Sequence, residues 1–274
     1  MNPFEKLVYS LQFEMERPVS YGAFHLCWLF ASAAVTVFLA VRKEKSHEAS
    51  MKAILLVYGV GALVLELIKQ VIWSYSYDPI SGIGHWDYQW YAAPFQLCTT
   101  PIFTCLISAF LKKGRLRDSL LSYTAFVTIL GSIATAFYPE ACFVRTVLVD
   151  VHTMYLHFGS LVVSIYLLLS KQIRPTFRNL LRSWLVFLVF AAAALAMDLI
   201  VYHSGILRGE TFNMFYISPY FISELPVFNA IWTWADANGL YPVFLLLYLF
   251  AICAGAGVAW MATRLFTRKP KSDL

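Results

Sequence analysis

The chain has 274 residues, of which 59% are hydrophobic and only 14% are charged, and its mean hydropathy is +0.64. These values exclude an ordinary soluble enzyme and predict a polytopic protein of the cell membrane that forms one domain, residues 1–274. The net charge of +5 indicates no nucleic-acid partner, because the basic residues gather in the linkers between apolar segments.

In chain order, a mixed polar segment of 18 residues comes first, followed by seven apolar runs. The first run is too long for the apolar part of a signal peptide and lacks a small-residue cleavage site, so we expect no cleaved targeting peptide. The seven runs predict an all-α bundle of seven transmembrane helices. The predicted helices cover residues 21–41, 53–73, 94–111, 119–138, 146–170, 183–203 and 240–263.

The basic residues alternate between the two sides of these predicted spans. Each of three linkers, and the tail from residue 264, contains four Lys or Arg residues. The three linkers are 42–52, 112–118 and 171–182. The other side has only Lys6, Arg17, Arg145 and Arg208. Because Lys and Arg concentrate on the cytoplasmic side of membrane proteins, this pattern predicts an outer N-terminus and a cytoplasmic C-terminus.

Two connections on the predicted outer side are rich in aromatic residues. The connection 74–93 contains no Lys or Arg, and the longer connection 204–239 is also aromatic. Tyr and Trp favour the boundary between lipid headgroups and water. We therefore expect residues 204–239 to lie on or dip into the outer interface.

Polar and ionisable side chains within the predicted spans cluster at one depth. Those in the outer half are His25, Glu66, Lys69, Gln70, Cys98, His152, Asp198 and His203, and His157 falls near the middle. Such residues are costly in a membrane and usually face one another or a cavity. The pattern predicts a polar pocket near the outer leaflet.

Simpler interpretations exist for several of these residues. Glu66 and Lys69 are three residues apart on one helix face and are expected to pair. Asp198, in an Ala- and Leu-rich helix, needs a partner of either a structural or a functional kind. A disulfide between Cys98 and Cys142 is an open alternative.

The spacing of His and Cys predicts neither a metal nor a cofactor. The five cysteines have no CxxC spacing, and His152 and His157 are five residues apart, so they do not share a helix face. A metal site assembled between helices from His152, Asp198 and His203 stays an alternative without support from spacing.

A thiol and an imidazole at similar depth in the membrane can act together as a nucleophile and its base. The imidazole takes the proton of the thiol, and the thiolate attacks an acyl carbonyl. Membrane lipids would supply the acyl group. Because many membrane proteins contain Cys and His, these residues alone leave acyl-group chemistry on Cys98 as one interpretation, with a non-catalytic binding protein or transporter as the alternative.

Several motifs resemble one known family in order and spacing. They are YGAFHL with His25, ELIKQVIW, PFQLC, LHFGSLVVSIYLL and FNMFYISP with Asn213. The chain resembles the YwaF-like bacterial integral membrane proteins, which share a seven-helix layout with the eukaryotic transmembrane ether-phospholipid acyltransferase and, more distantly, with the androgen-induced lipid-ester hydrolases. The resemblance implies an acyltransferase or hydrolase of phospholipids or other acyl lipids.

The resemblance also implies a catalytic pair, which maps by position to Cys98 and His157. Counted from residue 94, Cys98 lies only about 6 Å into the membrane and His157 about 16 Å past residue 146, so depth favours His152. If Trp90 marks the interface instead, Cys98 lies about 11 Å deep, and His157 comes within reach.

The remaining polar residues of this region are predicted to support the pair. We place His157 first and His152 second as the base, with Asp198 or Asp150 orienting the imidazole. Gln96, Thr99 and Thr100 are candidate hydrogen-bond donors to the acyl oxygen.

Overall fold

The computed structural model describes residues 1–42 and 48–267. Within those residues, six helical segments are long and apolar enough to cross a membrane. They are α2 (Ala23–Val41), α3 (Glu48–Trp73), the consecutive pair α5 (Arg115–Phe126) and α6 (Thr128–Phe137), α7 (Val147–Leu169), α8 (Phe177–His203) and α10 (Tyr241–Thr267). The chain is therefore a multi-pass membrane protein. Five of the basic residues behind the predicted topology, at positions 43, 45, 268, 269 and 271, lie outside the described residues.

The third predicted span differs from its prediction. Its helix, α4 (Thr100–Phe110), starts six residues later than expected, and residues 94–99 are not helical. Two local features explain the late start. The Thr99 hydroxyl accepts a hydrogen bond from the Gln96 backbone N–H at 2.9 Å, and Pro101 lies at the first turn of the helix, where its missing N–H costs nothing. With 11 residues, α4 is about 16 Å long, against a membrane core of about 30 Å.

The fourth predicted span is one membrane crossing made of two helices. α5 and α6 meet at Val127, and together they form a 23-residue apolar segment. Hydroxyl groups in this region bond back to the preceding turn, as Thr124 does to Leu120 O and Thr128 to Thr124 O. Such back-bonding competes with the helical hydrogen bonds and bends helices.

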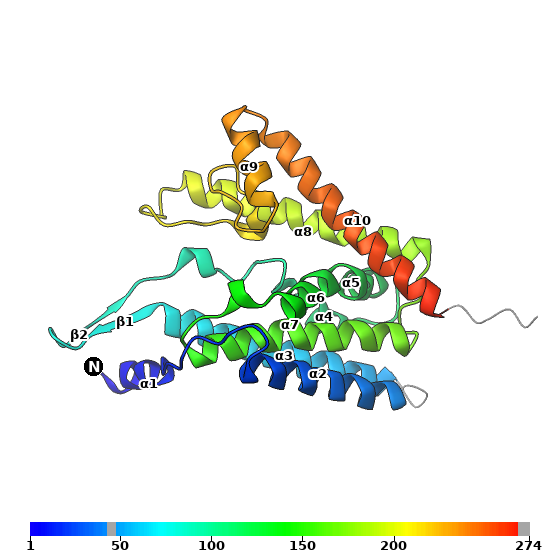
Figure 1. The fold of residues 1–274 in the computed structure, drawn as a ribbon, viewed down its shortest axis with the longest axis horizontal. Coiled ribbons are helices and arrows are strands. Elements are labelled where there is room, and N and C mark those ends of the chain that lie inside the picture. The colour runs from blue at the N-terminus through cyan, green and yellow to red at the C-terminus, as the bar shows by residue number, and fades with distance from the viewer. Residues whose placement is uncertain (43–47, 268–274) are drawn as a thin grey trace, which may run out of the picture.

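The helices form layers. Figure 1 shows α8, α9 (Phe228–Ala237) and α10 on one side and α2, α3 and α7 on the other, with α4, α5 and α6 between them. The closest packing joins α3 to α4, α5 to α8, and α7 to α2, α3 and α6. Consequently α5 connects the two outer layers.

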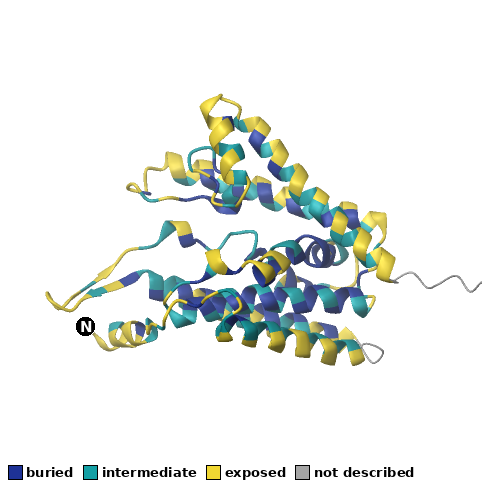
Figure 2. Ribbon diagram, in the orientation of Figure 1, coloured by how far each residue is buried: buried dark blue, intermediate teal, exposed yellow. Residues whose placement is uncertain are grey.

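Burial follows these layers. In Figure 2 the buried residues concentrate in the middle of the molecule, whereas α2, α9 and α10 expose long faces. Small hydroxyls bridge the central helices, with Thr104 2.7 Å from Thr124 and Thr128 3.1 Å from Ser160. Ser and Thr make such bonds between membrane helices because hydrocarbon offers no other partner.

Short elements cover one end of the bundle. α1 (Pro3–Leu11) packs on a hairpin of β1 (Tyr75–Asp78) and β2 (Ile83–Trp86), so part of the aromatic connection 74–93 is an antiparallel sheet. Three 3-10 turns follow along the chain: η2 (Trp90–Ala92), η3 (Glu140–Cys142) and η4 (Met214–Tyr216). The last of these lies in the connection 204–239, where Met214 and Phe215 are fully buried.

Candidate functional site

Cys98 lies in the turn just before α4 and is partly buried. The chain reaches this turn from η2, where the Ala92 carbonyl accepts from Lys69 Nζ at 3.0 Å and from Gln70 Nε2 at 2.6 Å. All five cysteines of the chain are free, so Cys98 and Cys142 are not joined as a disulfide. The thiol thus lies outside regular helix, near a group of buried charges.

That group is a buried ionic cluster of three side chains. Lys69 Nζ lies 2.7 Å from Glu66 Oε1, as the spacing predicted, and His152 Nε2 lies 2.7 Å from Glu66 Oε2. All three residues are less than 10% exposed. Gln70 donates to Glu66 at 2.8 Å, and Lys69 donates to the Ala92 carbonyl at 3.0 Å. The cluster therefore ties α3 to α7 and to η2, on the approach to Cys98.

The two histidines of α7 have different surroundings. His152 Nε2 lies 2.7 Å from Glu66 Oε2 as an ion-pair contact, and neither ring nitrogen makes a hydrogen bond within residues 1–42 and 48–267. His157 lies against the backbone of α6 at Gly131. In the same described residues, no hydrogen bond joins the Cys98 sulfur to either ring. Of the two, His152 is the one that belongs to the buried ionic cluster.

The two aspartates that we expected to orient a histidine bind backbone groups. Asp150 Oδ1 accepts from the Val144 N–H at 2.9 Å, and Asp198 Oδ1 accepts from the Met214 N–H at 2.7 Å. Glu66 is the carboxylate in contact with His152. The sequence missed this contact because the pairing of Glu66 with Lys69 already satisfied both charges.

Gln96 and Asn213 hold the η4 turn against the Cys98 turn. Gln96 Nε2 donates to the Asn213 carbonyl at 2.9 Å, and its Oε1 accepts from the Phe215 N–H at 2.8 Å. Asn213 in turn accepts from the Ser218 N–H at 2.9 Å. Phe215 and Tyr216 have φ of 57° and 58°, an uncommon conformation that these bonds stabilise.

The two threonines after Cys98 have their own partners. Thr99 Oγ1 donates to the Gln96 carbonyl at 2.9 Å, and Thr100 Oγ1 lies 2.7 Å from the Leu97 carbonyl and 2.6 Å from the Tyr123 hydroxyl. Gln96, Thr99 and Thr100 therefore fix the shape of the turn that carries Cys98.

His25 and His203 lie apart from this cluster. His25 is fully buried, and its Nδ1 accepts from the Tyr21 N–H at 3.1 Å. Its ring packs on Phe143 and Phe158. His203 Nε2 lies 2.8 Å from the Tyr220 hydroxyl. Nowhere in the part of the chain that the structure describes do three or more His, Cys, Asp or Glu side chains group as they would around a metal ion.

A tyrosine of α5 reaches the turn that carries Cys98, and the sequence analysis missed it. Tyr123 is 0% exposed, and its hydroxyl lies 2.6 Å from Thr100 Oγ1, two residues after Cys98. No spacing in the sequence could bring these residues together, because they meet only when α4 and α5 pack.

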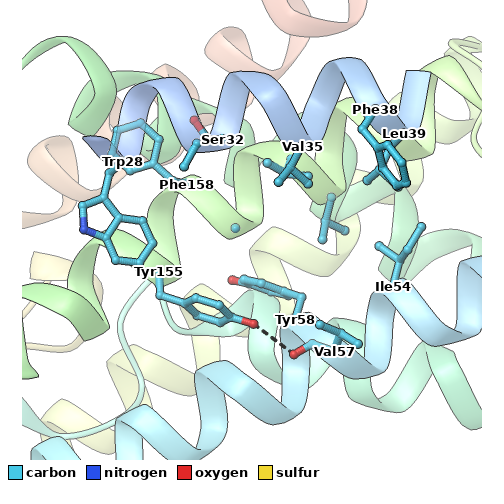
Figure 3. Close-up of a pocket in the computed structure, with 14 residues that line it drawn as sticks. Trp28, Ser32, Val35, Phe38, Leu39, Ile54, Val57, Tyr58, Tyr155 and Phe158 are labelled. Carbon is cyan, nitrogen blue, oxygen red and sulfur yellow. Dashed lines mark hydrogen bonds between the residues drawn. The ribbon is translucent and has the colours of Figure 1, made fainter. Parts of the chain in front are cut away.

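An apolar groove runs beside this region. It has a volume of about 490 Å³ and lies between α2, α3 and α7 (Figure 3). Its polar atoms are satisfied within the protein: the Tyr155 hydroxyl donates to Val57 O at 3.0 Å and the Tyr58 hydroxyl to Leu156 O at 3.1 Å. Tyr58, which lines the groove, belongs to α3, the helix that also carries Glu66 and Lys69.

The comparisons with known proteins place the chain in a family. The model of the TMEM164 family matches residues 19–260, a range that contains Cys98, the buried ionic cluster and Asn213. Neither the curated proteins nor the solved structures gave a match. The resemblance to the YwaF-like proteins stays a prediction, whereas the match over most of the chain shows that this membrane protein belongs to the TMEM164 family.

Proposed function

We propose that this protein is a lipid acyltransferase or acyl-ester hydrolase in which Cys98 is the nucleophile. The observation that carries the proposal is the place of Cys98, in a non-helical turn beside the buried cluster of Glu66, Lys69 and His152. Ionisable groups are rarely kept at membrane depth without a function. A thiol outside regular helix, next to such a group, fits covalent catalysis.

The reaction begins with transfer of the thiol proton to an imidazole. The Cys98 sulfur then attacks the acyl carbonyl of a membrane lipid, and the tetrahedral intermediate expels the lipid alkoxide, which takes the proton from the imidazolium. The product is a thioester on Cys98. Attack by a second lipid hydroxyl completes transfer, and attack by water completes hydrolysis.

The geometry supports His152 as the base ahead of His157. His152 has one ring nitrogen on the Glu66 carboxylate, and its Nδ1 has no hydrogen-bond partner in the described chain. A carboxylate that orients an imidazole, whose other nitrogen serves the nucleophile, is the arrangement of hydrolytic triads. Lys69 supplies a cation to balance the thiolate. His157 stays the choice that family resemblance favours.

The substrate we propose is a phospholipid or another acyl lipid of the cell membrane. The groove of Figure 3 offers only hydrocarbon contacts, which suits an acyl chain. For the topology we propose seven membrane segments, α4 being a short one, with the N-terminus outside and the C-terminus in the cytoplasm. This orientation puts Cys98 and the buried ionic cluster nearer the outer leaflet.

The experiment is lipid mass spectrometry of a total lipid extract incubated with the purified protein. We expect new or cleaved acyl lipids with the wild type and none with Cys98→Ala, whereas Cys105→Ala, a change to a buried thiol in α4, retains turnover. His152→Ala and His157→Ala in parallel identify the base. Turnover that survives Cys98→Ala would reject the cysteine mechanism.

A second candidate is a non-catalytic protein that binds a lipid headgroup or a solute. It is favoured by the lack of a direct hydrogen bond between Cys98 and the histidines within the described residues. In that case Cys98→Ala retains ligand affinity, and no lipid is converted by either protein.

A further inference from the structure

A polar cleft lies where the connection between α7 and α8 meets the start of α5. Figure 1 shows this connection at the end of the bundle opposite to α1 and the β1–β2 hairpin. The cleft has a volume of about 520 Å³, and its charged lining residues are Lys171, Arg174, Arg178, Arg182 and Asp118. Four cations against one carboxylate leave an excess of three positive charges. Such a concentration of one sign of charge in a cleft attracts anions.

The backbone that forms this cleft is fixed by bonds within the protein. Ile173 is 1% exposed, and its N–H donates to the Leu167 carbonyl at 3.1 Å. The Arg174 carbonyl accepts from the Thr176 N–H at 2.8 Å and from Asn179 Nδ2 at 3.0 Å. The cleft therefore needs no ligand to form, and a ligand that enters it does not have to order the connection.

The cations of the cleft differ in whether they have a partner. Arg182 Nη1 donates to Asp118 Oδ2 at 3.2 Å. Lys171, Arg174 and Arg178 are exposed, and within residues 1–42 and 48–267 their side chains make no ion pair or hydrogen bond. Like charges held close together repel one another. An anion that binds among these three side chains removes that repulsion.

The basic residues of the linker 112–118 provide a comparison. Lys113 Nζ lies 3.3 Å from Glu48 Oε2, and Arg117 also pairs with Glu48. The general preference of Lys and Arg for one side of a membrane applies to both connections alike. It does not explain why three cations without a partner converge on one cleft, so the cleft calls for a ligand of its own.

The start of α8 indicates what kind of anion fits. Thr176 caps this helix of 27 residues, and the first N–H groups and the dipole of a helix favour an anion. On an adjoining face of α8, Phe177, Leu181 and Leu185 follow at four-residue spacing and are 58%, 45% and 62% exposed. Acyl chains can cover this apolar stripe while an attached anion lies in the cleft. A free anion would use only the cations and the helix start.

We propose that this cleft binds the phosphate monoester headgroup of an anionic membrane lipid. A phosphate monoester carries about 1.5–2 negative charges at neutral pH, and its oxygens accept paired hydrogen bonds from Arg. It therefore neutralises more of the excess charge than a phosphate diester, which carries one. The cleft follows the C-terminal end of α7, whereas His152 lies near the N-terminal end, so this binding does not rest on the proposed acyl chemistry.

The test is a titration of the purified full chain, in detergent, with dioctanoyl phosphatidic acid. Native mass spectrometry counts the lipids bound to each protein molecule. We expect one lipid to bind saturably, and at least about tenfold more tightly than dioctanoyl phosphatidylglycerol, a diester, or dioctanoyl phosphatidylcholine. Arg174→Gln and Arg178→Gln should each weaken this binding about tenfold, the loss of one charge-assisted hydrogen bond. Thermal unfolding without lipid should be unchanged in both, because neither side chain bonds within the described protein.

Arg115→Gln is the matched control. Arg115 belongs to the linker 112–118, is exposed, and is not among the residues that line the cleft in the described structure. This change removes the same charge from the same end of the bundle, and we expect the affinity for phosphatidic acid to stay within about twofold. An equal loss in all three variants would mean that the lipid responds only to overall positive charge, and would overturn the site.

The other outcomes decide the identity of the ligand. Inorganic phosphate should displace phosphatidic acid only at a concentration at least about 10²-fold higher, because it lacks the acyl chains that cover α8. Displacement at a similar concentration would assign the cleft to free phosphate and overturn the lipid. Equal affinities for phosphatidic acid and phosphatidylglycerol would overturn the monoester, and binding that does not saturate would overturn the proposal as a whole.

Discussion

The membrane spans whose residues are mostly buried, which we call central, differ from the most exposed ones, which we call peripheral, in the side chains that they carry. In the most apolar stretch of each span, 67% of the residues of α5–α6 and 61% of those of α7 are buried. The corresponding shares are 6% for α2 and 17% for α10. The central spans carry bonded hydroxyls and the ring of His152. The peripheral spans present large apolar side chains outward, such as Phe30 at 67% exposure and Phe250 at 72%.

The difference shows where this fold tolerates polar chemistry. A charge that faces lipid has no partner, whereas a charge on the packed face between two helices finds one on its neighbour. Glu66 and His152 illustrate this, because α3 and α7 each supply one side of their contact. α10 joins the centre only through its inner face, which includes Phe244, Tyr248 and Ala256, all 0% exposed.

The largest expected effect comes from breaking the buried ionic cluster. Glu66→Ala leaves Lys69 and His152 buried without their carboxylate, and we expect it to reduce the free energy of unfolding by about 3–5 kcal/mol. Unfolding in a titration with sodium dodecyl sulfate measures the change.

The control for Glu66→Ala is an exposed ion pair of the same chemistry. Glu14 and Arg145 lie 3.3 Å apart with side chains 58% and 69% exposed, so Glu14→Ala should cost only about 0–1 kcal/mol. Similar losses in the two variants would contradict the importance of burial.

The second largest effect is expected at the junction of the two layers. Gln96→Leu removes the acceptor of the Phe215 N–H and the donor to the Asn213 carbonyl. An unsatisfied buried group costs about 1–3 kcal/mol, and we expect the upper end here because the strained η4 turn depends on the bond. Hydrogen exchange should show faster exchange in residues 212–222. Unchanged exchange there would mean that Asn213 and Asp198 hold the turn without Gln96.

The sequence predicted the bundle well because a long apolar run crosses a membrane as an α-helix. Six of the seven predicted runs correspond to helical segments long enough to cross one, and the contact of Glu66 with Lys69 followed from helical spacing. The need of Asp198 for a partner was also right, although that partner is the backbone of Met214.

The sequence could not predict features set by local bonds or by packing. The apolar run of residues 94–111 looks helical throughout, but the bond between Gln96 and Thr99 makes a turn of its first part. The bonds of Gln96 to Asn213 and Phe215 require two segments that are far apart in the chain to pack. The spacing of apolar residues predicts which face of a helix is apolar. It does not predict which other helix packs against that face.

The third prediction compares one glycine from each kind of span. A Cβ at Gly159 of α7 would lie 2.7 Å from the ring of buried Tyr58, whereas a Cβ at Gly257 of α10 would lie 4.0 Å from Trp184. Overpacking costs about 1–3 kcal/mol, and alanine gains up to about 1 kcal/mol in helix propensity. We expect Gly159→Ala to destabilise the protein by about 1 kcal/mol and Gly257→Ala to stabilise it slightly. Thermal unfolding in detergent measures both, and the same sign for both would contradict the packing difference.

The smallest effect is expected on the lipid-facing side, where stability should hardly change. Val35 lines the groove of Figure 3 and is 48% exposed, and Val37, two residues along the same helix, is 61% exposed and does not line it. Either residue changed to Trp should alter the free energy of unfolding by no more than about 0.5 kcal/mol.

If the groove holds the acyl chain, Val35→Trp shortens the space available and shifts the preference among acyl lipids toward shorter chains, by a few-fold. Val37→Trp should leave the preference as in the wild type. Competition between lipids of different chain length, read by mass spectrometry, measures the shift. Equal preferences in both variants would place the acyl chain elsewhere, because a bulky indole in an occupied groove must compete with the chain for the same space.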